Sequence, residues 1–128
     1  MLQVSQKKLS RLELRIMEVL WRHGAASVKE IQEGFPEQGR PAHTTVLTIL
    51  TRLEAKQAVR RAKKISNAYI YEPVVTREAT QRLLVNELLA FFGGRAAPLV
   101  SHLIESGQLT LKDVEDARKA LKKGAKRE

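Results

Sequence analysis

The sequence predicts a mainly α-helical protein with one small β-hairpin, divided into an N-terminal domain of residues 1–75 and a helical C-terminal domain of residues 76–128. Two observations predict this fold class. Apolar residues recur at the spacing of an α-helix in three segments before residue 57 and in three more after residue 75. Between them, residues 58–72 change to the alternating pattern of β-strands. The hydrophobic fraction of 43% over 128 residues is enough for a folded core.

The first predicted helix spans residues 11–23 and begins at a capping box. Ser10 and Glu13 have the side chains that satisfy the unpaired N–H groups of a first helical turn. Gly24 follows the helix and is the residue type that commonly ends one. The same Ser-x-x-Glu pattern opens a second, shorter helix over residues 27–34. Both helices are therefore predicted from their start signals as well as from their apolar spacing.

The third predicted helix follows Pro41, starts near His43 or Thr44, and runs to about Lys56. Wound at about 100° per residue, it gathers its apolar side chains on one side and a polar face on the other. Four threonines lie within eight residues of this helix, although threonine is only a moderate helix former. The apolar side carries Val46, Leu47, Ile49, Leu50 and Leu53, and the polar face carries Thr44, Thr45, Thr48, Thr51, Arg52, Ala55 and Lys56.

The side chains of this polar face are small near its centre, and its C-terminal half carries basic residues. Such a face suits the floor of a DNA major groove. Threonine can hydrogen-bond a phosphate or a base edge and can set its methyl group against that of thymine, and Arg52 can reach a guanine with two hydrogen bonds. The start of a helix also favours phosphate, and His43 there is either a phosphate contact or a plain turn residue. The face can instead be only solvated, with Thr44 or Thr45 serving as the N-cap. The local charge and the segment that follows favour nucleic acid.

Residues 58–62 and 68–72 are predicted as two short strands joined by the basic loop 63–67, and Pro73 ends the second strand. Three helices followed by a β-hairpin is the order of a winged helix-turn-helix domain. The hairpin would be the wing, whose basic side chains contact the phosphate backbone or the minor groove. A hairpin tip that meets only water is the alternative. The candidate contacts are Arg60, Lys63, Lys64 and Asn67, to which the third helix adds Lys56.

The net charge of the chain is +9, and its distribution favours a polyanionic partner. Residues 40–64 hold seven basic side chains against the single acid Glu54, whereas residues 76–119 intersperse the two signs. The absence of cysteine excludes disulfides and thiolate metal sites. The N-terminus carries no secretion signal and no apolar run is long enough to cross a membrane. We therefore expect a cytoplasmic protein without direct membrane binding.

We expect no enzyme activity, no cofactor and no metal site. The histidines His23, His43 and His102 are scattered along the chain, and none belongs to a close cluster of metal-ligating side chains. The sequence also contains no phosphate-binding loop, no nucleophile motif and no pair of acids with a reason to titrate abnormally.

Three further helices are predicted over residues 76–92, over residues 96–106, and from Thr110 into a basic tail where the last helix fades. From residue 83 to residue 92, seven of ten side chains are large and apolar, which is too many for a helix with one side in water. We interpret these helices as an interface between two copies of the chain, and an ordinary monomeric core is the alternative. The candidate dimerisation residues are Leu84, Leu88, Phe91, Phe92, Leu99, Leu103, Leu111 and Val114.

Four stretches of the chain resemble the penicillinase-repressor family, which contains the beta-lactamase, methicillin-resistance and copper-responsive repressors of bacteria. They are LSRLELRIMEVLWRHG (9–24), HTTVLTILTRLEAK (43–56), AYIYEPVVTREA (68–79) and FFGGRAAPLVSHLIESGQLT (91–110). The resemblance implies a homodimeric winged-helix repressor on a palindromic operator in double-stranded DNA. Its N-terminal half would bind the DNA and its C-terminal helices would form the dimer. Carried onto this chain, the DNA-facing positions are Thr44, Thr45, Thr48 and Arg52.

Three departures from the family pattern bear on function. Gln57 stands where the family usually has glycine, so a left-handed backbone there would cost about 1 kcal/mol. The copper-responsive branch carries a C-terminal cysteine cluster, and the lack of cysteine here excludes copper sensing of that kind. In the antibiotic-responsive branch, a membrane-bound metalloprotease sensor cuts the repressor at an Asn-Phe bond. The corresponding stretch from Val100 to Leu103 lacks that pair, and its candidate protease-sensitive position is His102 and Leu103.

The leading hypothesis is a sequence-specific transcriptional repressor. One alternative is a basic architectural protein that binds nucleic acid without sequence choice. Another is a winged-helix module whose third helix meets a protein. Preference for one palindrome over random DNA by about 10³-fold or more distinguishes the first hypothesis from the other two.

Overall fold

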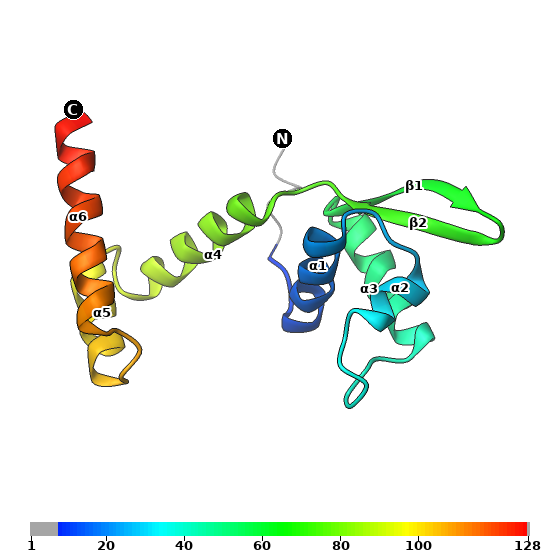
Figure 1. Cartoon of the computed structure of the whole chain (residues 1–128), viewed down its shortest axis with the longest axis horizontal. Helices are drawn as coiled ribbons and strands as arrows, with labels where there is room; N and C mark the ends of the chain where they lie inside the picture. The colour runs from blue at the N-terminus through cyan, green and yellow to red at the C-terminus, as the bar shows by residue number, and fades with distance from the viewer. Residues whose placement is uncertain (1–7, 128) are drawn as a thin grey trace. The chain divides into compact units, whose positions relative to one another are not determined.

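The computed structural model describes residues 8–127, with side chains described through residue 124. In this part of the chain the elements run as predicted, with three helices, a β-hairpin and three further helices (Figure 1). The chain divides into two compact units, and the division falls between Leu84 and Val85, within helix α4 (Arg77–Phe91). The domain boundary expected after residue 75 precedes this helix.

Helix α1 (Arg11–His23) begins at the predicted capping box. The hydroxyl of Ser10 accepts a hydrogen bond from the backbone N–H of Glu13 at 3.2 Å, and the carboxylate of Glu13 accepts one from the N–H of Ser10 at 2.7 Å. Gly24 follows the helix with a φ of +93°, which side chains rarely allow. Both predicted ends of α1 are therefore confirmed.

Helix α2 (Val28–Glu33) begins in the same way, with a capping box between Ser27 and Glu30. A Cβ atom on Gly34 would lie 2.5 Å from Cγ1 of Val19, so glycine allows the end of α2 to come this close to α1. Helix α3 packs against both of these helices.

Helix α3 (His43–Ala55) has the extent that the sequence predicts. The alternative in which Thr44 or Thr45 is the N-cap is wrong, because the helix already begins at His43 and Ala42 occupies the cap position. Ala42 has no side-chain acceptor, so no side chain caps this helix. Its first backbone N–H groups are left for water or for a bound anion.

Gln57 turns the chain from α3 into the hairpin. Its φ is +61°, the left-handed conformation that the family pattern suggested for this position. The N–H of Gln57 donates to the carbonyl of Glu54, and the N–H of Ala58 donates to the carbonyl of Leu53, each at 2.9 Å. These hydrogen bonds close the last turn of α3 and offset part of the cost of about 1 kcal/mol that a left-handed glutamine carries.

The hairpin consists of strands β1 (Val59–Ile65) and β2 (Ala68–Pro73), which pair in antiparallel fashion. The predicted loop over residues 63–67 is wrong, because Ile65 already pairs with Ala68 and the turn contains only residues 66 and 67. A two-residue turn lets the lysines of the expected loop pair within the strands. Figure 1 shows the hairpin reaching out from the three helices of its unit.

A backbone bridge connects the hairpin to the segment before α2. Ala26 and Tyr71 exchange two N–H···O hydrogen bonds, each 2.8 Å long. No pattern in the sequence predicts this bridge, since it joins positions far apart in the chain. The core of the unit lies between the three helices and the inner side of the hairpin. Its completely buried apolar members are Ile16, Met17, Leu20, Ala26, Ile31, Val46, Leu50 and Leu53.

The beginning of α4 is held against α1. The indole Nε1–H of Trp21 donates to the carbonyl of Val75 at 2.9 Å. The guanidinium of Arg77 lies 5.5 Å from the centre of the Trp21 ring system and forms a 3.0 Å ion pair with Glu18. These contacts fix the first turn of α4 to α1 within the first unit.

The second unit consists of the rest of α4 followed by α5 (Ala96–Glu105) and α6 (Leu111–Arg127). The predicted capping box of α6 is confirmed, because Thr110 and Asp113 exchange hydrogen bonds of 3.0 and 3.1 Å. The expectation that this helix fades into the tail is wrong. Lysine and alanine are good helix formers, and they carry α6 as far as Arg127 past the single Gly124.

The second unit has no buried side chain among its described residues, 85–124. Several of its large apolar side chains are more than two-fifths exposed, and these are Val85, Leu88, Phe91, Val100, Ile104, Leu111, Val114 and Leu121. In residues 8–127 no single helix is long and apolar enough to cross a membrane. Only α4 and α5 taken together, with a 94° bend between them, meet that criterion by length and composition.

Candidate nucleic-acid interface

Helix α3 has two faces, as its sequence predicts. Val46, Ile49, Leu50 and Leu53 are buried against the core. Leu47 was expected to join them, but it is 38% exposed, because its position on the helix is at the edge of the apolar stripe. The outward face carries exposed residues with small or basic side chains. These are His43, Thr44, Thr45, Thr48, Thr51, Arg52 and Ala55.

Two threonines of this face bond to their own helix. The hydroxyl of Thr48 donates to the carbonyl of Thr44 at 2.9 Å, and the hydroxyl of Thr51 donates to the carbonyl of Leu47 at 3.0 Å. Hydrogen bonds of this kind to the carbonyl four residues back are a common alternative for threonine within a helix. Each hydroxyl has one hydrogen, so these two side chains have no donor left while the bonds persist.

Arg52 is the basic residue at the centre of the predicted DNA-facing set. Its side chain is exposed on the outward face of α3. Among the residues that the structure describes, no carboxylate lies within ion-pair distance of Arg52. Its guanidinium can therefore accept a ligand without first breaking an ion pair.

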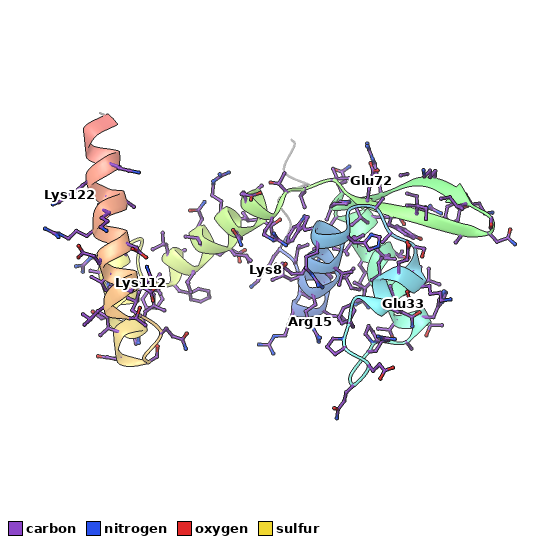
Figure 2. The ribbon with its side chains drawn as sticks, in the orientation of Figure 1. Lys8, Arg15, Glu33, Glu72, Lys112 and Lys122 are labelled. Atoms are coloured by element: carbon purple, nitrogen blue, oxygen red, sulfur yellow. The ribbon has the colours of Figure 1, made fainter. Side chains whose placement is uncertain are left out.

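The hairpin carries its basic side chains in two different settings. Arg60 donates to Glu72 across the strands at 2.6 Å, and Figure 2 labels Glu72 near the base of the hairpin. Lys63, Lys64 and Asn67 are exposed further along it, and no carboxylate in the described part of the chain forms an ion pair with either lysine. The positive charge of the hairpin is thus least compensated toward its tip.

Arg61 and Tyr69 form a contact that the sequence analysis missed. The guanidinium of Arg61 lies 4.8 Å from the ring centre of Tyr69, and the ammonium of Lys64 lies 5.3 Å from it. Arg61 also donates to Glu54 of α3 at 2.9 Å, which raises the pKa of Arg61. The prediction failed because it placed Lys64 in a loop. With a two-residue turn, Lys64 pairs with Tyr69 across the two strands. Arg61 thereby joins the hairpin to α3.

Lys56 was predicted to belong to the DNA-facing set, but its ammonium is bound within the protein. It lies 2.6 Å from the carboxylate of Glu13, which is only 2% exposed, and 2.8 Å from the carbonyl of Lys8. Burial would raise the pKa of Glu13, but hydrogen bonds from Lys56 and Ser10 and the charge of Lys56 outweigh it and lower the pKa. Lys56 therefore joins the end of α3 to the start of α1.

The predicted dimerisation residues lie on the three helices that follow the hairpin, except Phe92, which is the first residue after α4. Leu84, Phe92, Leu99 and Leu103 are half-buried. Leu88, Phe91, Leu111 and Val114 are exposed. His102, at the candidate cleavage position, is exposed on α5, and its ring centre lies 5.6 Å from that of Phe92. Lys112 and Lys122 project from α6 (Figure 2).

A model of the penicillinase repressor family matches residues 9–123, which include every element described above except the last residues of α6. The chain belongs to this family. Its winged-helix unit is the part that contains the exposed face of α3 and the basic hairpin, and its helical unit is matched through residue 123.

Individual relatives show the same likeness. The penicillinase repressor of Staphylococcus aureus is 26% identical over 120 residues, covering 91% of this chain and 92% of the relative. The solved structure of the CopR repressor is 32% identical with a TM-score of 0.45, covering 54% of this chain and 99% of its own. The DNA-binding domain of the repressor BlaI is 26% identical with a TM-score of 0.48, covering 54% of this chain and 83% of its own.

The ion pair between Glu13 and Lys56 gives a prediction for stability. The substitution Glu13→Gln keeps an acceptor for the N–H of Ser10 but removes the charge beside Lys56. We expect the free energy of unfolding, measured with urea near neutral pH, to fall by about 1.5–3 kcal/mol, the range for a hydrogen bond to a charged group. Glu30→Gln is the matched control, because Glu30 has the same capping role on an exposed side chain, and it should cost less.

The same variant should show a defined dependence on pH. A carboxyl whose pKa is lowered by folding stabilises the protein above its unfolded pKa, and this contribution is lost as the pH falls through the folded value. The difference in unfolding free energy between the wild type and Glu13→Gln should therefore shrink below the ordinary glutamate pKa of 4.5. A difference that stays constant from about pH 7 to about pH 3 would contradict this assignment.

Proposed function

We propose that this chain is a transcriptional repressor that binds double-stranded DNA sequence-specifically, as a homodimer on a palindromic operator. One observation carries the proposal: a member of the penicillinase repressor family exposes a low, threonine-rich face of α3 with Arg52 on it, next to a basic hairpin. The penicillinase repressor of Staphylococcus aureus supports the proposal, because its likeness extends over 91% of this chain and 92% of its own length.

The outward face of α3 has the shape that entry into the major groove requires. The groove is about 12 Å wide and accepts an α-helix whose outer side chains are short. Near the uncapped start of α3, His43, Thr44 and Thr45 lie beside backbone N–H groups that favour a phosphate. Toward the end of the helix, Arg52 can donate two hydrogen bonds to one guanine, which is the commonest specific contact to a base.

The hairpin supplies affinity that depends little on sequence. Phosphates beside the groove that α3 enters can be contacted by Lys63, Lys64 and Asn67. Arg60 can also bind a phosphate, once its ion pair with Glu72 is broken. Each phosphate that a lysine or arginine neutralises adds about 0.9 to the slope of log K against log salt. Arg61, bound to Glu54, holds the wing beside α3 in this arrangement.

The helical unit is proposed to form the dimer. None of its described side chains is fully buried within the single chain, and the exposed apolar side chains of α4 and α6 include Leu88, Phe91, Leu111 and Val114. Two chains that cover these surfaces would be related by a twofold axis. That symmetry sets two copies of α3 on half-sites about 10 base pairs apart or a multiple of it, so the operator would be a palindrome.

Selection of binding sites from random double-stranded DNA, followed by salt-titrated binding to the selected duplex, tests the proposed function. A repressor should prefer the selected palindrome over random DNA by about 10³-fold or more at physiological salt. An architectural protein would bind both duplexes equally with a steep dependence on salt. A protein-interaction module would bind neither, and either of these two results would overturn the proposal.

Arg52→Ala tests the assigned face of α3. Losing the contact to a base should weaken binding to the selected palindrome by about 1–3 kcal/mol, and should change binding to random DNA much less. Arg118→Ala on α6 is the control, since it removes the same charge from an exposed arginine of the other unit. Equal affinity of wild type and Arg52→Ala for the palindrome would show that this face does not read the operator.

Phe91→Glu tests the proposed dimer. Phe91 is 86% exposed in the single chain, so a charge there should leave the folding of the chain intact while it disrupts an apolar interface. Sedimentation equilibrium at micromolar concentration should give the mass of a dimer for the wild type and a clear shift toward the monomer for the variant. Asn86→Glu, at an exposed polar position of the same helix, should remain dimeric. A monomeric mass for the wild type contradicts the dimer.

Release from DNA through a membrane-bound sensor protease is the regulatory part of the proposal. The candidate bond between His102 and Leu103 lies inside α5, so α5 must open before a protease can bind this segment in extended form. The test is co-expression with a candidate sensor protease, followed by mass analysis of the repressor. We expect two fragments, one ending near residue 102 and the other beginning near residue 103. Intact chains together with loss of operator binding would exclude cleavage as the means of release.

A further inference from the structure

The threonines of α3 fall into two groups by what their hydroxyl groups can do. Thr48 and Thr51 donate to the carbonyls of Thr44 and Leu47 within the helix. For Thr44 and Thr45, the residue four positions back precedes the helix, so the same bond to a helical carbonyl is not available to them. The hydroxyls at the start of α3 can therefore donate outward, whereas those in its middle already donate inward.

The middle of the outward face consequently offers methyl groups and no free threonine donor. Leu47 is 38% exposed, and it lies one helical turn from Thr51, an exposed residue whose hydroxyl hydrogen bonds to the backbone. Thr48 and Ala55 continue the same face with further methyl groups. We name these four residues, Leu47, Thr48, Thr51 and Ala55, the methyl strip.

The strip has no free donor, and its methyl groups outnumber the two hydroxyl oxygens that remain as acceptors, so it favours an apolar group in the major groove. Phosphate oxygens and the acceptors of guanine require donors, which Thr48 and Thr51 lack while their internal bonds persist. The C5-methyl of thymine is the apolar group that the major groove displays. Burying an apolar side chain against it gains free energy without a hydrogen bond.

We propose that the methyl strip recognises thymine C5-methyl groups in each operator half-site. The inference rests on the proposed function, and it separates two tasks on α3. The residues of the methyl strip select thymine by contact between apolar groups. Arg52 and the first turn of the helix supply the hydrogen bonds to guanine and to phosphate.

The first experiment changes only the DNA. The duplex selected from the random pool is synthesised once with thymine and once with uracil in place of every thymine within the half-sites, which removes the methyl groups and keeps the base pairing. We expect the wild-type protein to lose about fourfold in affinity for each contacted methyl group, the value for burial of one methyl-sized group. Equal affinity for the two duplexes, or selected half-sites that contain no thymine, would overturn the inference.

The second experiment changes only the protein. Thr48→Val keeps the methyl group and removes the hydroxyl, whereas Thr48→Ser keeps the hydroxyl and removes the methyl group. Binding to the thymine duplex should survive Thr48→Val and fall about fourfold in Thr48→Ser, with the same pair of results at Thr51. The serine variants should also be less sensitive to uracil than the wild type. The opposite order, with valine harmful and serine neutral, would show that the hydroxyl makes the contact.

Two controls separate this inference from the proposed function. Thermal unfolding of each variant shows whether the fold is retained, and affinity for random DNA shows whether the general contacts to phosphate are retained. If the wild type does not prefer the selected duplex over random DNA, the proposed function itself fails. If it does prefer that duplex but responds neither to uracil nor to the loss of the threonine methyl groups, only the inference about the methyl strip fails.

Discussion

The apolar stripe of α3 packs against α1 and α2 through Val46, Leu50 and Leu53, all of which are completely buried. The same thirteen-residue helix presents its other side to solvent. Because the stripe is buried, the helix cannot rotate about its axis without exposing leucine and valine side chains, at a cost of about 1.5–3 kcal/mol for each one. The packing of the core therefore determines which side chains of α3 face outward, and the proposed interface with DNA depends on this packing.

Three contacts hold other parts of the first unit to that helix or to the core. The ion pair of Lys56 with Glu13 joins the end of α3 to the start of α1, and the bond of Arg61 to Glu54 joins the wing to α3. The bridge between Ala26 and Tyr71 fixes the base of the wing to the segment before α2. A winged-helix domain binds DNA with helix and wing at once, so the geometry between them has to be set before binding.

Local signals in the sequence predicted much of this structure, and what they missed depends either on contacts between distant residues or on details of local geometry. The capping boxes at Ser10 and Ser27 and the stripe of α3 depend on residues close in sequence, and they were predicted correctly. The position of the hairpin turn, the exposure of Leu47 and the inward direction of Lys56 were not. Lys56 has a partner 43 positions away in the chain, which no helical winding can reveal. The direction in which the hydroxyls of Thr48 and Thr51 donate was equally out of reach, because it depends on the rotamer of each side chain.

The absence of buried side chains in residues 85–124 has a consequence for how such a protein would respond to its own concentration. If the helical unit forms the dimer proposed above and completes its core in this way, folding and assembly become one equilibrium. At concentrations well below the dissociation constant of the pair, the amount of dimer rises with the square of the total amount of chain. Halving the synthesis of the protein would then reduce the DNA-competent form about fourfold. Occupancy of the operator would accordingly change more steeply than the abundance of the protein, and a repressed gene would switch over a narrower range of repressor levels.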